Sequence, residues 1–230
     1  MSNRNYGGCE MEIDNVQVVK PFGPLILIAQ LPEGVIKPLN EIVDVIKDRK
    51  DMGARLAGVI ETESEIPHSM LEEKKVMNIF HALSRSYIEQ AYLNAGLQDQ
   101  WNAMDVKTQM QSIWSVSQYE NEYNPQHNHS HCQISAVLYL KVPDFGKEIT
   151  NTGNPLNGRT ELIGNCGGIW SGQTHLITPK VGDFYIFPYD MQHLVYPFTG
   201  DGMRRSLVIN VDITRTKKFK MKDGKRDGYG

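Results

Sequence analysis

The spacing of the apolar residues changes near residue 100, and this change limits the possible folds more than any other feature of the sequence. Before it, apolar residues recur with a helical period. After residue 105, short runs rich in Val, Ile, Leu and Tyr are separated by Gly and Pro; they span residues 113–119, 135–142, 184–187, 192–196 and 204–213. Many short strands separated by turns are typical of a β-barrel or β-sandwich. We therefore predict a mainly β fold with flanking helices.

Two helices are predicted ahead of the strands. For the first, over residues 38–52, Pro38 suits the first turn and Gly53 the end, and the apolar stripe is Leu39, Ile42, Val43 and Ile46. The second is predicted over residues 69–95. There Ser69 and Glu72 match an S-x-x-E capping box, Gly96 can end the helix, and the stripe is Val76, Ile79, Phe80, Leu83 and Tyr87. Both stripes are expected to pack against a sheet.

These patterns divide the chain into three expected parts. Residues 1–104 form an N-terminal helical and strand segment that packs on the barrel, and residues 105–213 form the barrel core. Within the core, residues 147–172 are rich in Gly, Asn and Thr and are expected to be irregular. Residues 214–230 carry seven Lys or Arg and two Asp, which predicts a basic, mobile tail.

The composition favours a cytoplasmic globular protein. Of its 230 residues, 40% are hydrophobic and 22% are charged, which is an ordinary balance. The net charge of −3 argues against a general nucleic-acid binder, so only the basic tail is a candidate for such contact. Three widely spaced cysteines fit a reducing compartment. The longest apolar run, Leu25–Ala29, is too short to cross a membrane, and the oligomeric state stays open.

The strongest candidate for a functional site is the segment 123–131, which reads Y-N-P-Q-H-N-H-S-H. Three of the seven histidines fall here within five residues: His127, His129 and His131. Alternate residues of an extended chain point to the same face, so two neighbours can chelate one metal ion. Imidazole is a ligand for iron, copper, zinc and nickel. The alternative is that this segment is a polar surface strand. These residues alone do not decide between a metal site and a surface strand.

A later histidine and an Arg-x-Ser pair add to the candidates. His193 lies in the short run 192–196, and by itself could be a core or rim histidine. Arg204 and Ser206 open the strand 204–213 and share one of its faces. A guanidinium and a hydroxyl on one face of a barrel strand make a receptor for a carboxylate. Taken alone, however, Arg204 could equally pair with a surface acid.

In this order, the motifs resemble the iron(II)/2-oxoglutarate-dependent oxygenase superfamily, and most closely its prolyl-4-hydroxylase-like members from bacteria and phages. Those members carry N-x-x-H-x-H, a strand similar to S-G-V-Y-Y-L, F-P-x-x-x-x-H, and R-x-S-x-x-x-N. The corresponding segments here are Asn124 to His129, Ser135 to Leu140, Phe187 to His193, and Arg204 to Asn210. The resemblance covers residues 114–211, whereas the preceding segment is similar only in its helical character.

The resemblance implies a double-stranded β-helix, which is a jelly-roll, cupin-like fold. It implies that His127, His129 and His193 bind Fe(II), and that Arg204 and Ser206 hold the distal carboxylate of the cosubstrate 2-oxoglutarate. It also implies that O2 and 2-oxoglutarate are consumed, a substrate C–H bond is hydroxylated, and succinate and CO2 are released. The substrate stays unidentified: a protein side chain, a nucleobase or a small molecule would each be compatible.

Tyr139 and Ser135 have the same strand parity as the histidines, so they either line the 2-oxoglutarate pocket or belong to the ordinary barrel interior. Trp114, Gln118 and Tyr119 precede the histidine motif and are candidates for contact with cosubstrate or substrate, without an assigned role.

The sequence departs from the wider superfamily at one ligand position. Most members have H-x-D, but here His129 stands in place of the aspartate, which leaves the site one charge unit more positive. His131 also leaves a second register open, in which His129 pairs with His131 and not with His127.

Three other functions compete with the oxygenase. A cupin-like metalloenzyme that does not use 2-oxoglutarate would share the barrel and the histidines but has no need of Arg204 and Ser206. A metal-dependent hydrolase would need a general base, for which Glu120 and Glu122 are the nearby candidates. A metal-stapled, non-enzymatic module that docks through its basic tail would leave the Arg-x-Ser pair unexplained.

Overall fold

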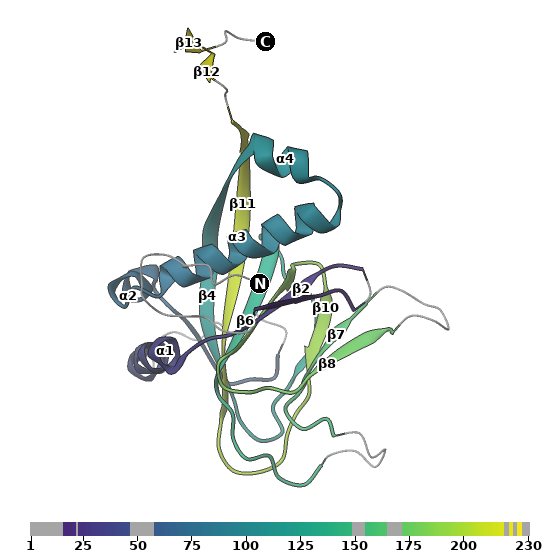
Figure 1. Cartoon of the computed structure of the whole chain (residues 1–230). Helices are drawn as coiled ribbons and strands as arrows, with labels where there is room; N and C mark the ends of the chain where they lie inside the picture. The colour runs from purple at the N-terminus through teal and green to yellow at the C-terminus, as the bar shows by residue number, and fades with distance from the viewer. Residues whose placement is uncertain are drawn as a thin grey trace.

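The computed structural model describes residues 16–21, 23–46, 58–148, 155–164, 172–218, 221–222 and 225–226. Two antiparallel sheets form the centre of the molecule, and the helices cover the outer face of the larger sheet, as Figure 1 shows. This layered arrangement is the predicted mainly β fold with flanking helices.

The larger sheet has the strand order β1-β2-β9-β6-β11-β4-β3. Its strands are β1 (Gln17–Val19), β2 (Ile26–Gln30), β9 (Asp183–Pro188), β6 (Ile134–Lys141), β11 (Arg204–Lys217), β4 (Met104–Gln118) and β3 (Thr62–Glu65). The smaller sheet has the order β5-β10-β7-β8. Its strands are β5 (Asn124–His127), β10 (Gln192–Val195), β7 (Thr160–Ile163) and β8 (Thr174–Ile177). A short hairpin of β12 (Met221–Lys222) and β13 (Lys225–Arg226) follows β11.

Every predicted strand is present, but two are several residues longer than expected. β4 begins at Met104 and not at residue 113, and β11 ends at Lys217 and not at residue 213. The two strands pair along their entire lengths, so each supplies the hydrogen-bond partner that extends the other. The expectation that residues 147–172 are irregular is wrong for β7, which pairs with both β10 and β8.

The first predicted helix is present but begins earlier. Helix α1 runs from Glu33 to Ile46, so Pro38 lies inside it and not in its first turn. The helix extends toward the N-terminus because Val35 and Ile36 add two buried apolar residues to its stripe. The predicted stripe residues are all buried, as expected. The predicted end at Gly53 lies outside the described residues.

The second predicted helix is two helices, α2 (His68–Glu73) and α3 (Met77–Asn94), and α4 (Gln98–Ala103) follows. Lys75, with φ of 58°, breaks the helical backbone between α2 and α3. The predicted capping box is wrong, because Ser69 lies inside α2. The predicted end at Gly96 is confirmed: its φ is 72°, and the Leu97 N–H donates to the Tyr92 carbonyl at 2.9 Å, as in a Schellman motif.

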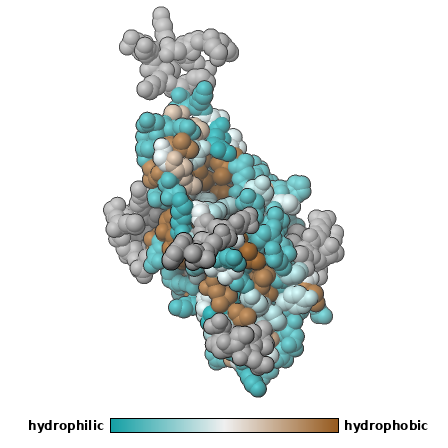
Figure 2. Space-filling view, turned by 90° about the vertical axis from the view of Figure 1, so that its right-hand side faces the viewer, coloured by the Kyte–Doolittle hydropathy of each residue, from teal (hydrophilic) through white to brown (hydrophobic). Residues whose placement is uncertain are grey.

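The apolar residues form separate clusters on the two faces of the larger sheet. The main core lies between this sheet and the helices, and it contains the predicted stripes of α1 and α3. Two smaller clusters, around Tyr139 and around Trp114, lie on the opposite face of the same sheet. Figure 2 looks onto the side of the smaller sheet, where hydrophobic residues appear in separate areas among hydrophilic ones. Among the described residues, no helix is both long and apolar enough to span a membrane.

Candidate metal centre and adjoining cavity

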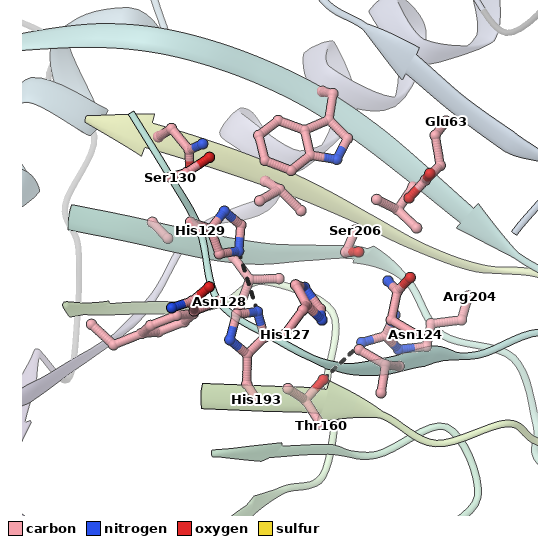
Figure 3. A pocket seen from close by; sticks show the side chains of 18 residues that line it. Glu63, Asn124, His127, Asn128, His129, Ser130, Thr160, His193, Arg204 and Ser206 are labelled. Carbon is pink, nitrogen blue, oxygen red and sulfur yellow. Dashed lines mark hydrogen bonds between the residues drawn. The ribbon is translucent and has the colours of Figure 1, made fainter. Parts of the chain in front are cut away.

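Three histidines, two from the smaller sheet and one from the segment after β5, converge on one point. His127 ends β5 and lies directly opposite His193 of β10 in the antiparallel register. His129 follows β5, and its backbone N–H donates to the Tyr189 carbonyl at 2.9 Å. One ring nitrogen from each of the three lies within 4.8 Å of the other two, and the side chains face each other in Figure 3. This spacing suits three ligands of one metal ion.

Backbone carbonyls orient two of these rings. The Nδ1–H of His127 donates to the Pro125 carbonyl at 2.7 Å, and the Nδ1–H of His193 donates to the Met191 carbonyl at 2.9 Å. Each ring is thereby left with Nε2 as its lone-pair nitrogen. The Nε2 atoms of His129 and His193 lie 3.2 Å apart. A hydrogen bond that fixes the tautomer in this way is the usual support of a metal-bound imidazole.

All three imidazoles are held in the neutral form that binds metals. Burial, together with the neighbouring histidines, lowers the pKa of His193 to about 3. Burial and the charge of His127 lower the pKa of His129 to about 4. The pKa of His127 is also lowered, mainly by burial. The site is therefore ready to accept a cation at neutral pH without first losing protons from these rings.

A polar and aromatic surrounding fixes the third ring. The Asn210 side chain hydrogen-bonds His129, and Asn210 in turn accepts a hydrogen bond from Ser135 Oγ at 3.1 Å. The rings of Trp114 and His129 lie 5.7 Å apart between centroids. Ser135, which strand parity places among the pocket candidates, thus contacts the site through Asn210.

His131 lies apart from this cluster. It is exposed, and its φ of 55° turns the backbone between β5 and β6. The alternation that brings His127 and His129 to one side therefore ends before residue 131. The structure brings His127 and His129 together, as in the first register. It does not bring His129 and His131 together.

A cavity of about 230 Å³ adjoins the histidines. Both sheets contribute to its walls, with β4 and β11 on one side and β5, β7 and β10 on the other. Figure 3 shows the histidines at one side of this space and Arg204 with Thr160 at the other. Its apolar lining includes Trp114, Val116, Phe187, Val195 and Val208, and its polar lining includes Glu63, Asn124, Thr160, Arg204 and Ser206.

Arg204 is the largest fully buried side chain of the described chain, at 1% exposure. Its Nη2 donates to Thr160 Oγ1 at 3.0 Å, and its Nη1 donates to Gln118 Oε1 at 3.2 Å. The guanidinium carbon lies 4.9 Å from the centre of the Tyr139 ring. Burial lowers the pKa of Arg204. Within the described residues, no carboxylate lies within 4.0 Å of this guanidinium, so both its side-chain acceptors are neutral oxygens.

The remaining predicted site residues lie in two positions relative to the cavity. Ser206 lines it beside Arg204, in agreement with their shared parity. Tyr139 lies behind the arginine, where its hydroxyl donates to Thr160 Oγ1 at 2.9 Å and its ring packs on the guanidinium. It therefore contacts Arg204 and is not among the residues that line the cavity.

Sequence reasoning missed Thr160 and Glu63 as cavity residues. Thr160 lies in the segment expected to be irregular, and Glu63 lies in β3, which no strand pattern indicated. Gln118 was named only as a general candidate, yet it contacts Arg204 directly. The sequence did indicate Asn124 and Asn210, because they belong to the N-x-x-H-x-H and R-x-S-x-x-x-N motifs.

Comparison with known proteins supports the fold and the resemblance of the motifs. Residues 112–210 match the family model described as "Putative 2OG-Fe(II) oxygenase", whereas no curated protein matches the chain. The structure is similar to a prolyl-4-hydroxylase from Pseudomonas putida, with a TM-score of 0.51 and 15% identity, over 86% of this chain and 91% of that chain. It is also similar to a prolyl hydroxylase from Trichoplax adhaerens, solved with a hypoxia-inducible-factor peptide fragment, with a TM-score of 0.52 and 10% identity, over 86% and 83% of the two chains.

A third similar structure is the non-heme α-ketoglutarate-dependent epimerase SnoN from nogalamycin biosynthesis, with a TM-score of 0.52 and 10% identity, over 81% and 78% of the two chains. These likenesses confirm the predicted jelly-roll fold, and the family model covers both histidine motifs and the Arg-x-Ser strand. The match to the 2OG-Fe(II) oxygenase family model, a family named for 2-oxoglutarate and iron(II), spans residues 112–210 of the 230-residue chain.

Proposed function

We propose that His127, His129 and His193 hold Fe(II), that Arg204 and Ser206 bind the distal carboxylate of 2-oxoglutarate, and that the enzyme hydroxylates a substrate C–H bond. When bound, the metal and cosubstrate supply the oxidising chemistry, in which O2 is consumed, succinate and CO2 leave, and one oxygen atom enters the substrate. The chain's own residues ligate the metal, orient the cosubstrate and keep water from the cavity.

The buried guanidinium carries this proposal. Arg204 is fully buried at the cavity wall, and it donates hydrogen bonds to two neutral oxygens, Gln118 Oε1 and Thr160 Oγ1. Burying a cation is costly unless an anion pairs with it. A ligand carboxylate in the cavity would supply that anion, and Ser206 beside it offers a hydroxyl as a further donor. Because the histidines line the same cavity, the ligand would need one group for the metal and a carboxylate at its far end.

The cavity has the size for such a ligand. At about 30 Å³ per water molecule in the liquid, its volume of about 230 Å³ corresponds to roughly seven or eight waters. A five-carbon diacid fits into this space. Its apolar walls, which include Trp114, Val116 and Val208, suit the methylene groups between the two ends.

The donor set fits a divalent first-row metal. Three neutral imidazoles supply no negative charge, so the metal keeps its full positive charge on the protein side. A dianionic cosubstrate would offset that charge. Iron is therefore proposed to bind more firmly in the presence of 2-oxoglutarate than in its absence, because each favours the other's binding.

The substrate is a protein side chain or a small molecule. Prolyl peptides are the first class to test, because two similar structures are those of prolyl hydroxylases. The similar epimerase SnoN shows that the fold also supports a different outcome. We propose a cytoplasmic setting on the basis of the few, widely spaced cysteines, of which Cys132 is a buried free thiol.

Succinate formation tests the proposal. The Fe(II)-loaded protein should bind 2-oxoglutarate under anaerobic conditions, and after admission of O2 it should release succinate. The His193→Ala variant should release none, whereas the His131→Ala variant should match the wild type. A protein that binds iron but not 2-oxoglutarate would instead favour the cupin-like alternative.

The hydrolase alternative is disfavoured by the positions of its candidate bases. Glu122 accepts hydrogen bonds from the backbone N–H groups of Tyr119 and Glu61, at 2.7 and 3.1 Å. Glu120 accepts one from the Gly200 N–H at 2.8 Å. Neither carboxylate lines the cavity, so neither is available to a metal-bound water there.

A further inference from the structure

Gln118 is the residue directly opposite Arg204 in the pairing of β4 with β11. Its side chain is fully buried, at 0% exposure. Its Nε2 donates to two backbone carbonyls, that of Glu122 at 2.6 Å and that of Tyr196 at 3.0 Å. Its Oε1 accepts a hydrogen bond from Arg204 Nη1 at 3.2 Å. The amide thus uses both of its N–H groups and its oxygen.

These contacts permit only one orientation of the amide. Because both N–H groups point at carbonyl oxygens, the amide oxygen must face the guanidinium. A flipped amide would place its oxygen against two carbonyl oxygens and its N–H groups against the N–H groups of Arg204, which loses every hydrogen bond. The backbone therefore fixes an acceptor in front of Arg204 in advance of any ligand.

The two carbonyls belong to the segments that lead to the metal ligands. Glu122 lies in the turn between β4 and β5, and β5 ends at His127. Tyr196 directly follows β10, which carries His193. Gln118 therefore connects the arginine to the turn before β5 and to the residue that follows β10.

The type of acceptor is as important as its position. An amide oxygen holds the guanidinium in place but leaves its positive charge uncompensated. A carboxylate in the same position would form an ion pair with Arg204 and compete with a ligand carboxylate. The other acceptor, Thr160 Oγ1, is also neutral.

We infer that Gln118 is a positioning residue that presents Arg204, with its charge available, to the distal carboxylate of the cosubstrate. This inference rests on the proposed function. According to this inference, Gln118 makes the cavity prefer a keto acid with a second carboxylate over a keto acid without one. Gln118 acts through Arg204 and is not expected to contact iron or substrate.

The test compares two keto acids of equal chain length, 2-oxoglutarate and 2-oxopentanoate, which lacks the distal carboxylate. Both are titrated anaerobically into Fe(II)-loaded wild type, Gln118→Glu, Gln118→Met and the control Gln98→Glu, which adds the same charge at an exposed position of α4. Gln118→Glu should weaken 2-oxoglutarate binding by about tenfold or more, which equals about 1.4 kcal/mol, and leave 2-oxopentanoate binding unchanged. Gln118→Met should show a smaller loss confined to 2-oxoglutarate, and Gln98→Glu should show none.

The outcomes separate this inference from the proposed function. A wild type that binds no 2-oxoglutarate would remove the proposed function itself. If the wild type prefers 2-oxoglutarate and both Gln118→Glu and Gln118→Met retain that preference, only the role of Gln118 is overturned. Equal losses for both keto acids would also overturn it, because they indicate a purely structural role. If Gln118→Glu does not fold, as judged by thermal melting, the same comparison on Gln118→Met decides.

Discussion

Arg204 and Arg205 are neighbours in β11, yet their guanidinium groups lie on opposite faces of the larger sheet. Arg204 lines the cavity with the histidines. Arg205 points to the helical layer, where it donates to Asn40 Oδ1 at 3.0 Å and pairs with Asp44 Oδ1 at 2.8 Å. The alternation of side chains along a strand explains the separation. The two arginines therefore provide a matched pair for experiments.

Arg204→Ala should weaken the anaerobic binding of 2-oxoglutarate by about two orders of magnitude or more, because removing one partner of a buried charge pair costs about 3–5 kcal/mol. Iron binding should be nearly unchanged, since the Arg204 side chain donates its hydrogen bonds to Gln118 and Thr160 and not to the histidines. Arg205→Ala should affect 2-oxoglutarate much less and should instead lower the melting temperature. Equal losses of affinity in the two variants would contradict this assignment.

His193→Ala should lose most of its bound iron, because His193 lies at the centre of the cluster, with ring centroids 4.2 Å from His127 and 5.0 Å from His129. The metal content of the purified, iron-loaded variants measures this. His131→Ala, whose side chain is exposed, is the control and should keep its iron. Full metal content in His193→Ala, or its loss in His131→Ala, would show that the ligand set is wrong.

Thr160→Val should weaken 2-oxoglutarate binding by about tenfold. The substitution keeps the shape of the side chain but removes the oxygen that accepts hydrogen bonds from both Arg204 and Tyr139. Leaving such buried donors without a partner costs about 1–3 kcal/mol. Thr174→Val, at an exposed position of β8, is the matched control. Calorimetric titration of 2-oxoglutarate into both iron-loaded variants measures the difference, and unchanged affinity in Thr160→Val would contradict it.

The metal-free protein should lose stability as the pH falls below about 6.5. Burial lowers the pKa of His193 from 6.5 to about 3 and that of His129 to about 4, so in this range the unfolded chain takes up protons that the folded chain does not. Stability therefore decreases as the pH falls from 6.5 toward these values. Urea unfolding at a series of pH values measures the slope. His193→Gln should have a shallower slope, and an identical slope would argue against this origin.

Gly96→Ala should destabilise the protein by about 1–2 kcal/mol, because an L-residue with a side chain is strained in the left-handed conformation that Gly96 adopts, with φ of 72°. A Cβ there would meet no atom within 4 Å, so the cost is one of backbone strain and not of a clash. Urea unfolding measures the change. A variant as stable as the wild type would contradict the assigned C-terminal motif of α3.

The sequence determined the elements whose signals are local. The apolar stripes of α1 and α3 could be predicted because apolar residues at a helical period form one face, whatever element covers that face. The parity of Arg204 and Ser206 was readable because side chains alternate along any strand. The end of α3 at Gly96 was readable because few residues other than glycine adopt a positive φ.

The proposed ligand set could be predicted only in part from local sequence signals. The H-x-H pair and the F-P-x-x-x-x-H segment indicated the histidines, but residues 127–131 allow two registers when they are read as one extended strand. The turn at His131 separates the two, and a positive φ at a histidine leaves little trace in a single sequence. Pairing of β5 with β10 then brings His127 opposite His193 across a long sequence separation.

The surroundings of Arg204 were decided by the tertiary structure alone. Gln118, Tyr139 and Thr160 come from β4, β6 and β7, and only the pairing of strands within each sheet and the packing of the two sheets bring them to one guanidinium. Short strands such as β3 and β7 carry too few residues to show a period, so their pairing depends on the neighbours that the fold supplies. The sequence therefore indicated candidate residues for the chemistry, whereas long-range strand pairing and sheet packing decided their register and what holds them in place.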